Sequence, residues 1–97
     1  MSERDSSAKS ESISEMRRYH TLYLRAINNP FRRKILRVLK DDPSTIEELH
    51  HVMGLAKNTL EWHLNILENG FCVKREDKEG RMIYKLTKEG EVVDFME

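Results

Sequence analysis

The sequence has few of the residues on which several classes of protein depend. It contains one cysteine, Cys72, which excludes an internal disulfide framework and a zinc site built from clustered cysteines. Only two prolines and four glycines interrupt its 97 residues, and 35% of them are charged. That composition is typical of a folded domain rather than a linker. The length predicts one small domain with a single modest core.

Long hydrophobic runs are also missing. No segment approaches the roughly 18 apolar residues of a membrane-spanning helix, and the N-terminus lacks the apolar core of a signal peptide. These absences predict a cytoplasmic protein without a membrane partner. There is no glycine-rich phosphate loop, nucleophile motif or acid pair in an expected cleft, so we expect no enzymatic activity.

The charges cancel in total, but they are unevenly distributed. Residues 1–15 hold two basic and four acidic residues, and residues 41–97 hold seven basic and thirteen acidic ones. Residues 16–40 between them hold eight basic residues and no acidic one. Phosphate binding requires local rather than total positive charge, so neutrality is compatible with a nucleic-acid ligand. We expect such binding to depend strongly on salt.

Apolar periodicity predicts two helices before residue 41. Residues 1–12 are polar and aperiodic, and we expect a disordered tail there. A helix is expected from about residue 13 to residue 28, where Asn28-Asn29-Pro30 interrupts it. A second helix should cover residues 30–40 with Arg32, Arg33 and Arg37 turned outward. The expected buried stripes are Ile13, Met16, His20, Tyr23, Leu24 and Ile27 in the first helix, and Phe31, Ile35, Val38 and Leu39 in the second.

The most informative segment runs from Thr45 to Leu67. Its first half predicts a short helix that Ser44 or Thr45 caps, and Gly54 ends it. Its second half predicts a helix over about residues 57–69. A helix, a glycine-containing turn and a second helix are the pattern of a DNA-binding helix-turn-helix. The expected buried faces consist of Ile46, Leu49, Val52 and Met53 in the first helix, and Leu60, Leu64 and Leu67 in the second.

After residue 70 the apolar period changes from 3.6 to 2. Residues 71–75 and 82–86 alternate as two strands, and residues 77–80 form the expected hairpin loop, with Gly80 at a positive φ. Thr87 should then cap a final helix. The expected fold is mainly α with a small β-hairpin, a winged helix-turn-helix over residues 13–97 with terminal dimerisation helices.

Three stretches in this order resemble the winged-helix regulators of the ArsR type: AINNPFRRKILRVL, LAKNTLEWHLNILENGFCVKRE and GRMIYKLTKEG. The resemblance covers roughly residues 20–92. It implies a transcriptional regulator, usually a homodimer held by its terminal helices on a palindromic operator. Chains of this size with this pattern are common in archaea, which suggests an archaeal source. Metal-sensing members carry a cysteine pair in the third helix, where this chain has Glu47-Glu48-Leu49-His50-His51-Val52.

Candidate DNA contacts lie in the second helix of the motif, about residues 57–69, which we call the recognition helix, and in the wing, residues 75–83. Asn58 suits adenine and Glu61 suits a cytosine amino group, whereas Lys57 and Thr59 suit phosphates. Trp62 suits a thymine methyl, a sugar or a protein partner. Arg81 should enter a minor groove, although charged loops also keep strand edges soluble. The full set is Thr45, Lys57, Asn58, Thr59, Glu61, Trp62, Asn65, Arg75, Lys78 and Arg81.

The run Arg32-Arg33-Lys34 is ambiguous, since it suits either phosphate contact or a solvated face. An apolar excess at the two ends of the domain predicts a homodimer interface. Its expected members are Met16, Tyr19, Tyr23, Leu24, Val92, Val93, Phe95 and Met96.

No metal or other cofactor is expected, and no small-molecule effector can be identified. His50 and His51 point about 100° apart on a helix and cannot chelate one ion together. His20 and His63 lie on apolar stripes and are expected to be core histidines. Cys72 would be a redox sensor only if its thiolate were exposed.

Two functions remain open. The first is a sequence-specific, dimeric DNA-binding regulator, which the basic residues 16–40 and the arginine-bearing wing favour. The alternative is a winged-helix protein-interaction module without specific DNA binding, which Glu61, Trp62 and the acidic second half favour.

Overall fold

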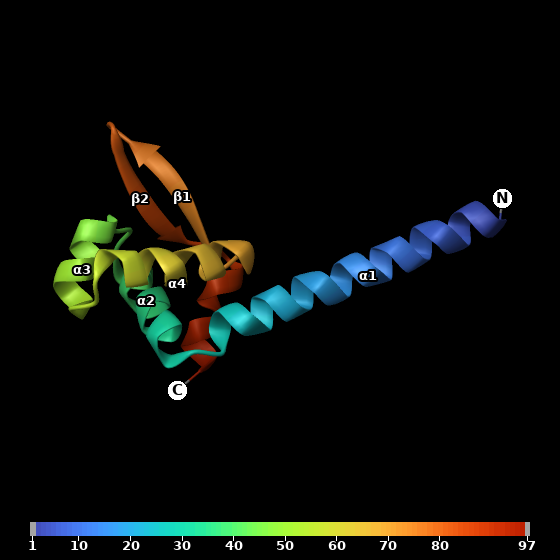
Figure 1. Cartoon of the computed structure of the whole chain (residues 1–97), viewed down its shortest axis with the longest axis horizontal. Coiled ribbons are helices and arrows are strands. Elements are labelled where there is room, and N and C mark those ends of the chain that lie inside the picture. Colours follow the sequence, from blue (N-terminus) through green and yellow to red (C-terminus); the bar gives the residue numbers. More distant parts are fainter. Residues whose placement is uncertain (1, 97) are drawn as a thin grey trace.

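A long helix projects from a small body of helices and one hairpin (Figure 1). The structure, a computed structural model, describes the backbone of residues 2–96 and the side chains of residues 13–96. Its elements, in chain order, are α1 (Ser2–Ile27), α2 (Pro30–Asp41), α3 (Ile46–Met53), α4 (Lys57–Asn69), β1 (Val73–Lys78), β2 (Arg81–Leu86) and the 3-10 helix η1 (Glu89–Phe95).

Helix α1 begins at Ser2 and so includes residues 2–12 of the segment for which we expected a disordered tail; Met1 lies outside the described residues. Extending an existing helix costs far less than starting one, and no proline or glycine interrupts residues 2–27. The projecting helix raises the radius of gyration to 16.2 Å, against about 12.5 Å for a compact chain of this length. Among the described residues, no helix is both long and apolar enough to cross a membrane.

Helix α2 starts as expected, but it buries a different face. The Asn29 side chain caps it by accepting hydrogen bonds from the backbone N–H groups of Phe31 and Arg32. Arg32 is buried, whereas Phe31 is half exposed, the reverse of the expectation. The buried stripe of α2 consists of Arg32, Ile35, Leu36 and Leu39, at the helical spacing i, i+3, i+4, i+7.

Helices α3 and α4 form the expected pair around Gly54. Thr45 and Glu48 make a reciprocal capping box at the start of α3, and Gly54 ends it with φ 71°. Only Leu49 of α3 is fully buried; Val52, which we expected on the buried face, is exposed. Helix α4 follows after three residues and lies in the middle of the body (Figure 1).

The wing is tighter than the sequence predicted. Strands β1 and β2 pair antiparallel from Val73 opposite Leu86 to Lys78 opposite Arg81. Only Glu79 and Gly80 remain in the turn, with φ values of 53° and 81°, as in the two-residue turns that match the twist of a hairpin. A four-residue loop over residues 77–80 was therefore wrong, while the positive φ of Gly80 is confirmed.

The chain closes with a 3-10 helix rather than an α-helix. The Thr87 hydroxyl donates to the carbonyl of Phe71 and accepts from the N–H of Gly90, which fixes the start of η1. Lys40 and Asp94 form an ion pair that joins α2 to η1. The single core includes the following residues: Ala26, Ile27, Ile35, Leu36, Leu39, Leu49, Leu60, Leu64, Ile66, Leu67, Cys72, Val73, Tyr84 and Val93.

Candidate nucleic-acid interface

The outward face of α4 carries four exposed side chains at the spacing i, i+3, i+4, i+7. Leu60, Leu64 and Leu67 anchor the opposite face in the core. This anchoring leaves the outward set Asn58, Glu61, Trp62 and Asn65, as the sequence predicted. Trp62 is 55% exposed, a large apolar area for a surface residue. The face offers amide, carboxylate and indole groups, and its one charge is negative.

The N-terminal end of α4 lacks a side-chain cap. Ala56 occupies the capping position and makes no side-chain hydrogen bond. The Asn58 side chain accepts from the N–H of Thr59 at 2.9 Å, and Lys57 is exposed beside it. The backbone N–H groups and the lysine together give this end a positive character.

The structure removes Thr45 from the candidate contacts. The residue is 3% exposed, and its hydroxyl bonds to the backbone N–H and carboxylate of Glu48. Glu48 also lies 3.6 Å from the Arg81 guanidinium, an exposed ion pair between α3 and the wing. Thr45 is thus the cap of α3, one of the two caps that the sequence predicted, and its burial leaves little surface for the DNA contact that we also expected of it.

The wing's basic residues divide into two groups. Lys78 and Arg81 flank the turn and are exposed at its tip. Arg75 lies lower on β1, where its guanidinium donates to both carboxylate oxygens of Glu68 on α4, at 2.7 and 2.8 Å. This hydrogen-bonded ion pair raises the pKa of Arg75. We therefore assign Arg75 to holding the wing on α4; the sequence had placed it with the DNA contacts.

Behind α4, a buried arginine joins three elements, and sequence reasoning missed it. Arg32 is 6% exposed; its Nε donates to the carbonyl of Ala26 at 3.0 Å, and one terminal nitrogen donates to the carbonyl of Arg25 at 2.8 Å. Both carbonyls belong to the last turn of α1, where helical partners are lacking. The other terminal nitrogen lies 3.2 Å from Nδ1 of His63 on α4. The signal was present in the sequence, because Arg32 shares a helical stripe with Ile35, Leu36 and Leu39.

His63 is the buried histidine that the sequence predicted, at 5% exposure. Burial and the neighbouring Arg32 charge lower its pKa, so the neutral ring is favoured. Trp62 packs edge-on against the ring at 4.9 Å, and the Arg32 guanidinium lies 5.8 Å from the Trp62 ring centre. His20, expected in the core, is instead exposed on α1.

Much of the basic segment is bonded to the protein itself. Arg33 donates to the carbonyl of Ile27, Arg37 donates to the carbonyl of Met96, and Lys40 pairs with Asp94. With the buried Arg32, half of the eight basic residues between 16 and 40 have such partners. The segment therefore contributes less positive surface than its composition predicted.

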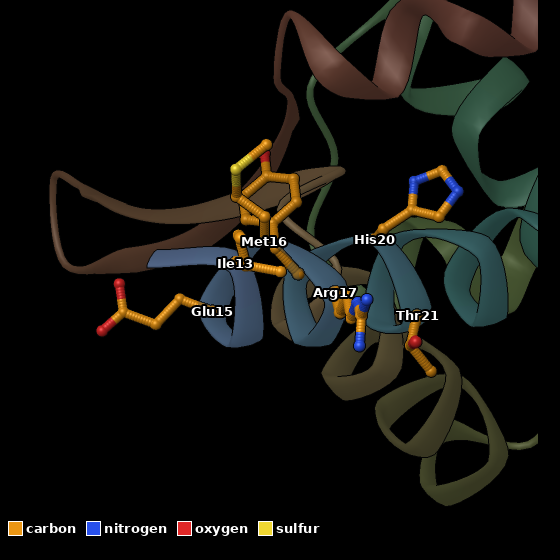
Figure 2. Close-up of a pocket in the computed structure, with 7 residues that line it drawn as sticks. Ile13, Glu15, Met16, Arg17, His20 and Thr21 are labelled. Atoms are coloured by element: carbon orange, nitrogen blue, oxygen red, sulfur yellow. The ribbon is translucent and has the colours of Figure 1, made fainter. Parts of the chain in front are cut away.

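Apolar side chains line α1 where it leaves the body. An open, mostly apolar hollow follows residues 13–21, and Met16 and His20 extend from one side of the helix while Thr21 extends from the other (Figure 2). Met16 is 68% exposed, and Leu24 is exposed too. Tyr19 stacks on Phe71 with ring centres 4.5 Å apart.

The expected dimer surface at the C-terminal end is smaller than predicted. Phe95 is exposed, and Val92 and Met96 are partly buried against the core. Val93, however, is 1% exposed and belongs to the core of a single chain. It cannot contribute to an interface without unfolding η1, so we remove it from the candidate interface.

His50 and Cys72 both lie in surroundings that give them structural roles. Nδ1 of His50 lies 2.6 Å from the carbonyl of Leu55, so the ring donates across the turn between α3 and α4. Cys72 is fully buried, and burial raises the pKa of its thiol to about 11. A buried, protonated thiol is a poor redox sensor. Among the described residues, no three His, Cys, Asp or Glu side chains gather as a metal site would require.

Residues 27–71 match the family described as a helix-turn-helix domain. They run from the end of α1 to the residue after α4, and thus contain both helices of the expected motif. No curated protein sequence matches the chain closely enough to count as a relative.

Solved structures resemble the chain over most of its length. HlyU from Vibrio cholerae superposes with a TM-score of 0.70 and 24% identity, over 80% of this chain and 87% of that one. The transcriptional repressor BigR from Xylella fastidiosa superposes with a TM-score of 0.68 and 20% identity, over 90% of this chain and 91% of that one. A predicted DNA-binding transcriptional regulator from E. coli superposes with a TM-score of 0.66 and 19% identity, over 96% of this chain and 94% of that one. The fold is a winged helix-turn-helix. That part of the sequence prediction is confirmed.

Proposed function

We propose that this chain is a sequence-specific DNA-binding transcriptional regulator of the ArsR-like type that lacks the metal-binding cysteines. The observation that most strongly supports this proposal is that, on a winged helix-turn-helix fold, the outward face of α4 is exposed beside a wing tip that carries a lysine and an arginine. In this proposal α4 lies in a major groove, and the wing lies on the backbone or in the adjacent minor groove.

The proposed contacts follow from chemistry and exposure. Asn58 has an amide suited to the major-groove edge of adenine, and Glu61 has an acceptor suited to the amino group of cytosine. Lys57 and Thr59 at the start of α4 suit phosphates, as does Lys78 at the wing tip. Trp62 and Asn65 complete the base-facing set, and Arg81 suits a narrow minor groove.

We propose that the regulator acts as a homodimer through α1. Tyr23 packs against the core and Tyr19 stacks on Phe71, whereas Met16 and Leu24 are exposed on α1. An isolated projecting helix is marginally stable in water, so a second copy would stabilise it by covering its apolar side chains. Val92, Phe95 and Met96 would extend this interface at the C-terminal end.

A protein-interaction module is the second candidate. The negative charge of Glu61 opposes phosphates, and an exposed tryptophan is a favoured contact residue in protein interfaces. Both residues lie in the centre of the face that a recognition helix would present to DNA. This alternative predicts that the same face binds a protein and that no duplex is selected.

Selection of bound fragments from a pool of random duplexes tests the proposal. We expect enrichment of a palindrome whose half-sites are about 10–10.5 base pairs apart, because a two-fold dimer places its recognition helices one DNA turn apart. A variant with Asn58→Ala and Asn65→Ala is the control, since it should keep the fold and lose the enrichment. If the wild-type protein enriches no sequence and shifts no duplex at low salt and micromolar concentration, the interaction module becomes the better account.

A further inference from the structure

The cluster behind the recognition helix contains one side chain, Arg32, that connects three helices. Arg32 is a residue of the first turn of α2. Its guanidinium donates to two carbonyls in the last turn of α1 and bonds to His63 in the middle of α4. A guanidinium is planar and rigid, so its partners are held in fixed relative positions. At this depth such a group must be well paired, because an uncompensated buried charge is costly.

The pairing decides the tautomer of His63. Arginine has only donors, so the Nδ1 atom 3.2 Å away must accept. An accepting Nδ1 places the ring's single proton on Nε2. Burial of the ring and the positive charge of Arg32 both oppose a second proton on it. Among the residues that the structure describes, Arg32 is the charged group that lowers the pKa of this ring.

The fixed ring in turn supports Trp62. The centre of the His63 ring lies 6.1 Å from that of Phe31 and 4.9 Å from that of Trp62, and the Arg32 guanidinium lies 5.8 Å from the centre of the indole. Trp62 is therefore held from behind by an aromatic edge and by a cation, while more than half of it remains exposed on the outward face of α4.

We propose that Arg32 is a positioning residue for the recognition helix, acting through one tautomer of His63 to fix Trp62 at the nucleic-acid face. This inference rests on the proposed DNA-binding function for its effect on affinity, but not for its effect on His63 and Trp62. It also assigns Arg32 a role beyond capping α1, because the bond to His63 connects the α1–α2 corner to α4.

Four variants separate this role from simple capping. Arg32→Met removes the whole network. His63→Leu keeps the bonds from Arg32 to α1 but removes the acceptor on α4. His63→Asn provides an acceptor near the position of Nδ1 and cannot be protonated, so it should rescue the contact. Lys34→Met is the matched control, since Lys34 is an exposed basic residue of the same helix outside the network.

The first readouts need no DNA. Nitrogen-15 NMR of wild-type protein should show the His63 proton on Nε2 and a pKa below that of free histidine; in Arg32→Met the pKa should rise and both tautomers should appear. Trp62 is the only tryptophan, so intrinsic fluorescence reports on it alone. Its emission should change in Arg32→Met and His63→Leu and stay close to wild type in His63→Asn and Lys34→Met.

The last readout is affinity for a duplex obtained by selection. Arg32→Met and His63→Leu should each bind roughly tenfold more weakly, the loss expected for one charge-assisted hydrogen bond. A double variant that combines Arg32→Met with His63→Leu should bind no more than about twofold more weakly than either single variant, because both changes break the same contact. His63→Asn and Lys34→Met should stay within about threefold of wild type.

A proton on Nδ1 in the wild-type protein would overturn the inference, and so would Trp62 fluorescence that ignores His63→Leu. Full affinity in a folded His63→Leu variant would overturn it as well. If Arg32→Met does not fold, the His63 variants decide the question alone. If no duplex binds wild-type protein while the NMR and fluorescence results hold, the proposed function fails and the positioning of Trp62 by Arg32 stands.

Discussion

Two glycines end neighbouring helices for different physical reasons. Gly54 has φ 71°, in the left-handed region, and a Cβ there would meet no atom within 4 Å. Gly70 has φ −89°, which any residue adopts, but its Cβ would lie 2.5 Å from Cβ of Ala26 and 2.8 Å from the carbonyl oxygen of Leu22. Gly70 is therefore required by the close approach of α1 to the end of α4.

Gly70→Ala should lower the free energy of unfolding by about 2 kcal/mol, because overfilling a packed contact forces α1 and α4 apart. Asn69→Ala is the control; this neighbouring side chain is exposed and should cost less than about 0.5 kcal/mol. Urea denaturation of both variants measures the difference. Equal stabilities would show that α1 does not approach α4 as closely as described.

Cys72 should be inert in the folded protein. Burial raises the pKa of its thiol to about 11, so little thiolate exists at neutral pH and reagents cannot reach the sulfur. We expect the reaction with a thiol-specific disulfide reagent at pH 8 to be limited by unfolding. In urea-unfolded protein the same thiol should react within the mixing time. A fast reaction under native conditions would restore the redox-sensor interpretation.

At the scale of residues, the sequence predicted which residues form caps, turns and buried stripes better than it predicted which side chains bond to each other. The cap of α3 at Ser44 or Thr45, the turn glycines Gly54 and Gly80, and the buried leucines of α4 follow local rules of capping, turn geometry and periodicity, and the structure confirms these predictions. The roles of Arg32 and Arg75 depend on groups distant in the chain: His63 is 31 residues from Arg32, and Glu68 comes from a different element than Arg75. No local pattern specifies those pairings.

At the scale of elements, the wing is held at its base and exposed at its tip. The bidentate pair between Arg75 and Glu68 joins β1 to the last turn of α4, and Glu76 pairs with Lys85 across the hairpin. The Glu76–Lys85 ion pair lowers the pKa of the Glu76 carboxyl. These pairs fix the direction in which the tip, with Lys78 and Arg81, projects from the body.

Arg75→Gln and Lys78→Gln should therefore affect DNA binding differently. Loss of a phosphate contact reduces the slope of log affinity against log salt by about 1. We expect this reduction for Lys78→Gln but not for Arg75→Gln, whose charge Glu68 already balances. Anisotropy titrations with one duplex at several salt concentrations provide the slopes. An equal reduction of the salt slope in Arg75→Gln and Lys78→Gln would mean that Arg75 contacts a phosphate as well.

Element boundaries were predictable where an apolar period or a turn residue marks them. Helix α2 begins at the predicted proline and ends one residue past the predicted end, and α3 begins at the predicted cap and ends at Gly54. Helix α4 covers the predicted residues 57–69, although Ala56 gives it no side-chain cap. The start of α1 and the nature of η1 were not predictable. A polar helix extension has no apolar period, and a 3-10 turn differs from an α-turn by one hydrogen-bond register.

At the scale of the whole molecule, the last turns of α1 pack on the body, whereas Ile13 and Met16 farther along the helix are exposed in the single chain. The protein should sediment as a dimer at tens of micromolar. Met16→Asp should shift it to monomer, because the charge would be buried against the second copy. Val52→Asp is the control: Val52 is also an exposed apolar residue, but it lies on α3. Monomeric wild-type protein, or an equal effect of both variants, would contradict an interface on α1.

The central claim is that the α4 face and the wing tip bind duplex DNA with sequence preference. The most direct measurement is affinity for the selected duplex and a scrambled one as salt is raised, for wild type, Arg81→Ala, Asn58→Ala and Asn69→Ala. We predict a steep fall with salt in wild type, and in Arg81→Ala weaker binding to both duplexes with a slope lower by about 1. Asn58→Ala should keep the slope and lose about tenfold of the preference between duplexes, because it removes a base contact; Asn69→Ala should match wild type. Equal affinity of wild-type protein for both duplexes, or no binding at low salt, would contradict the claim.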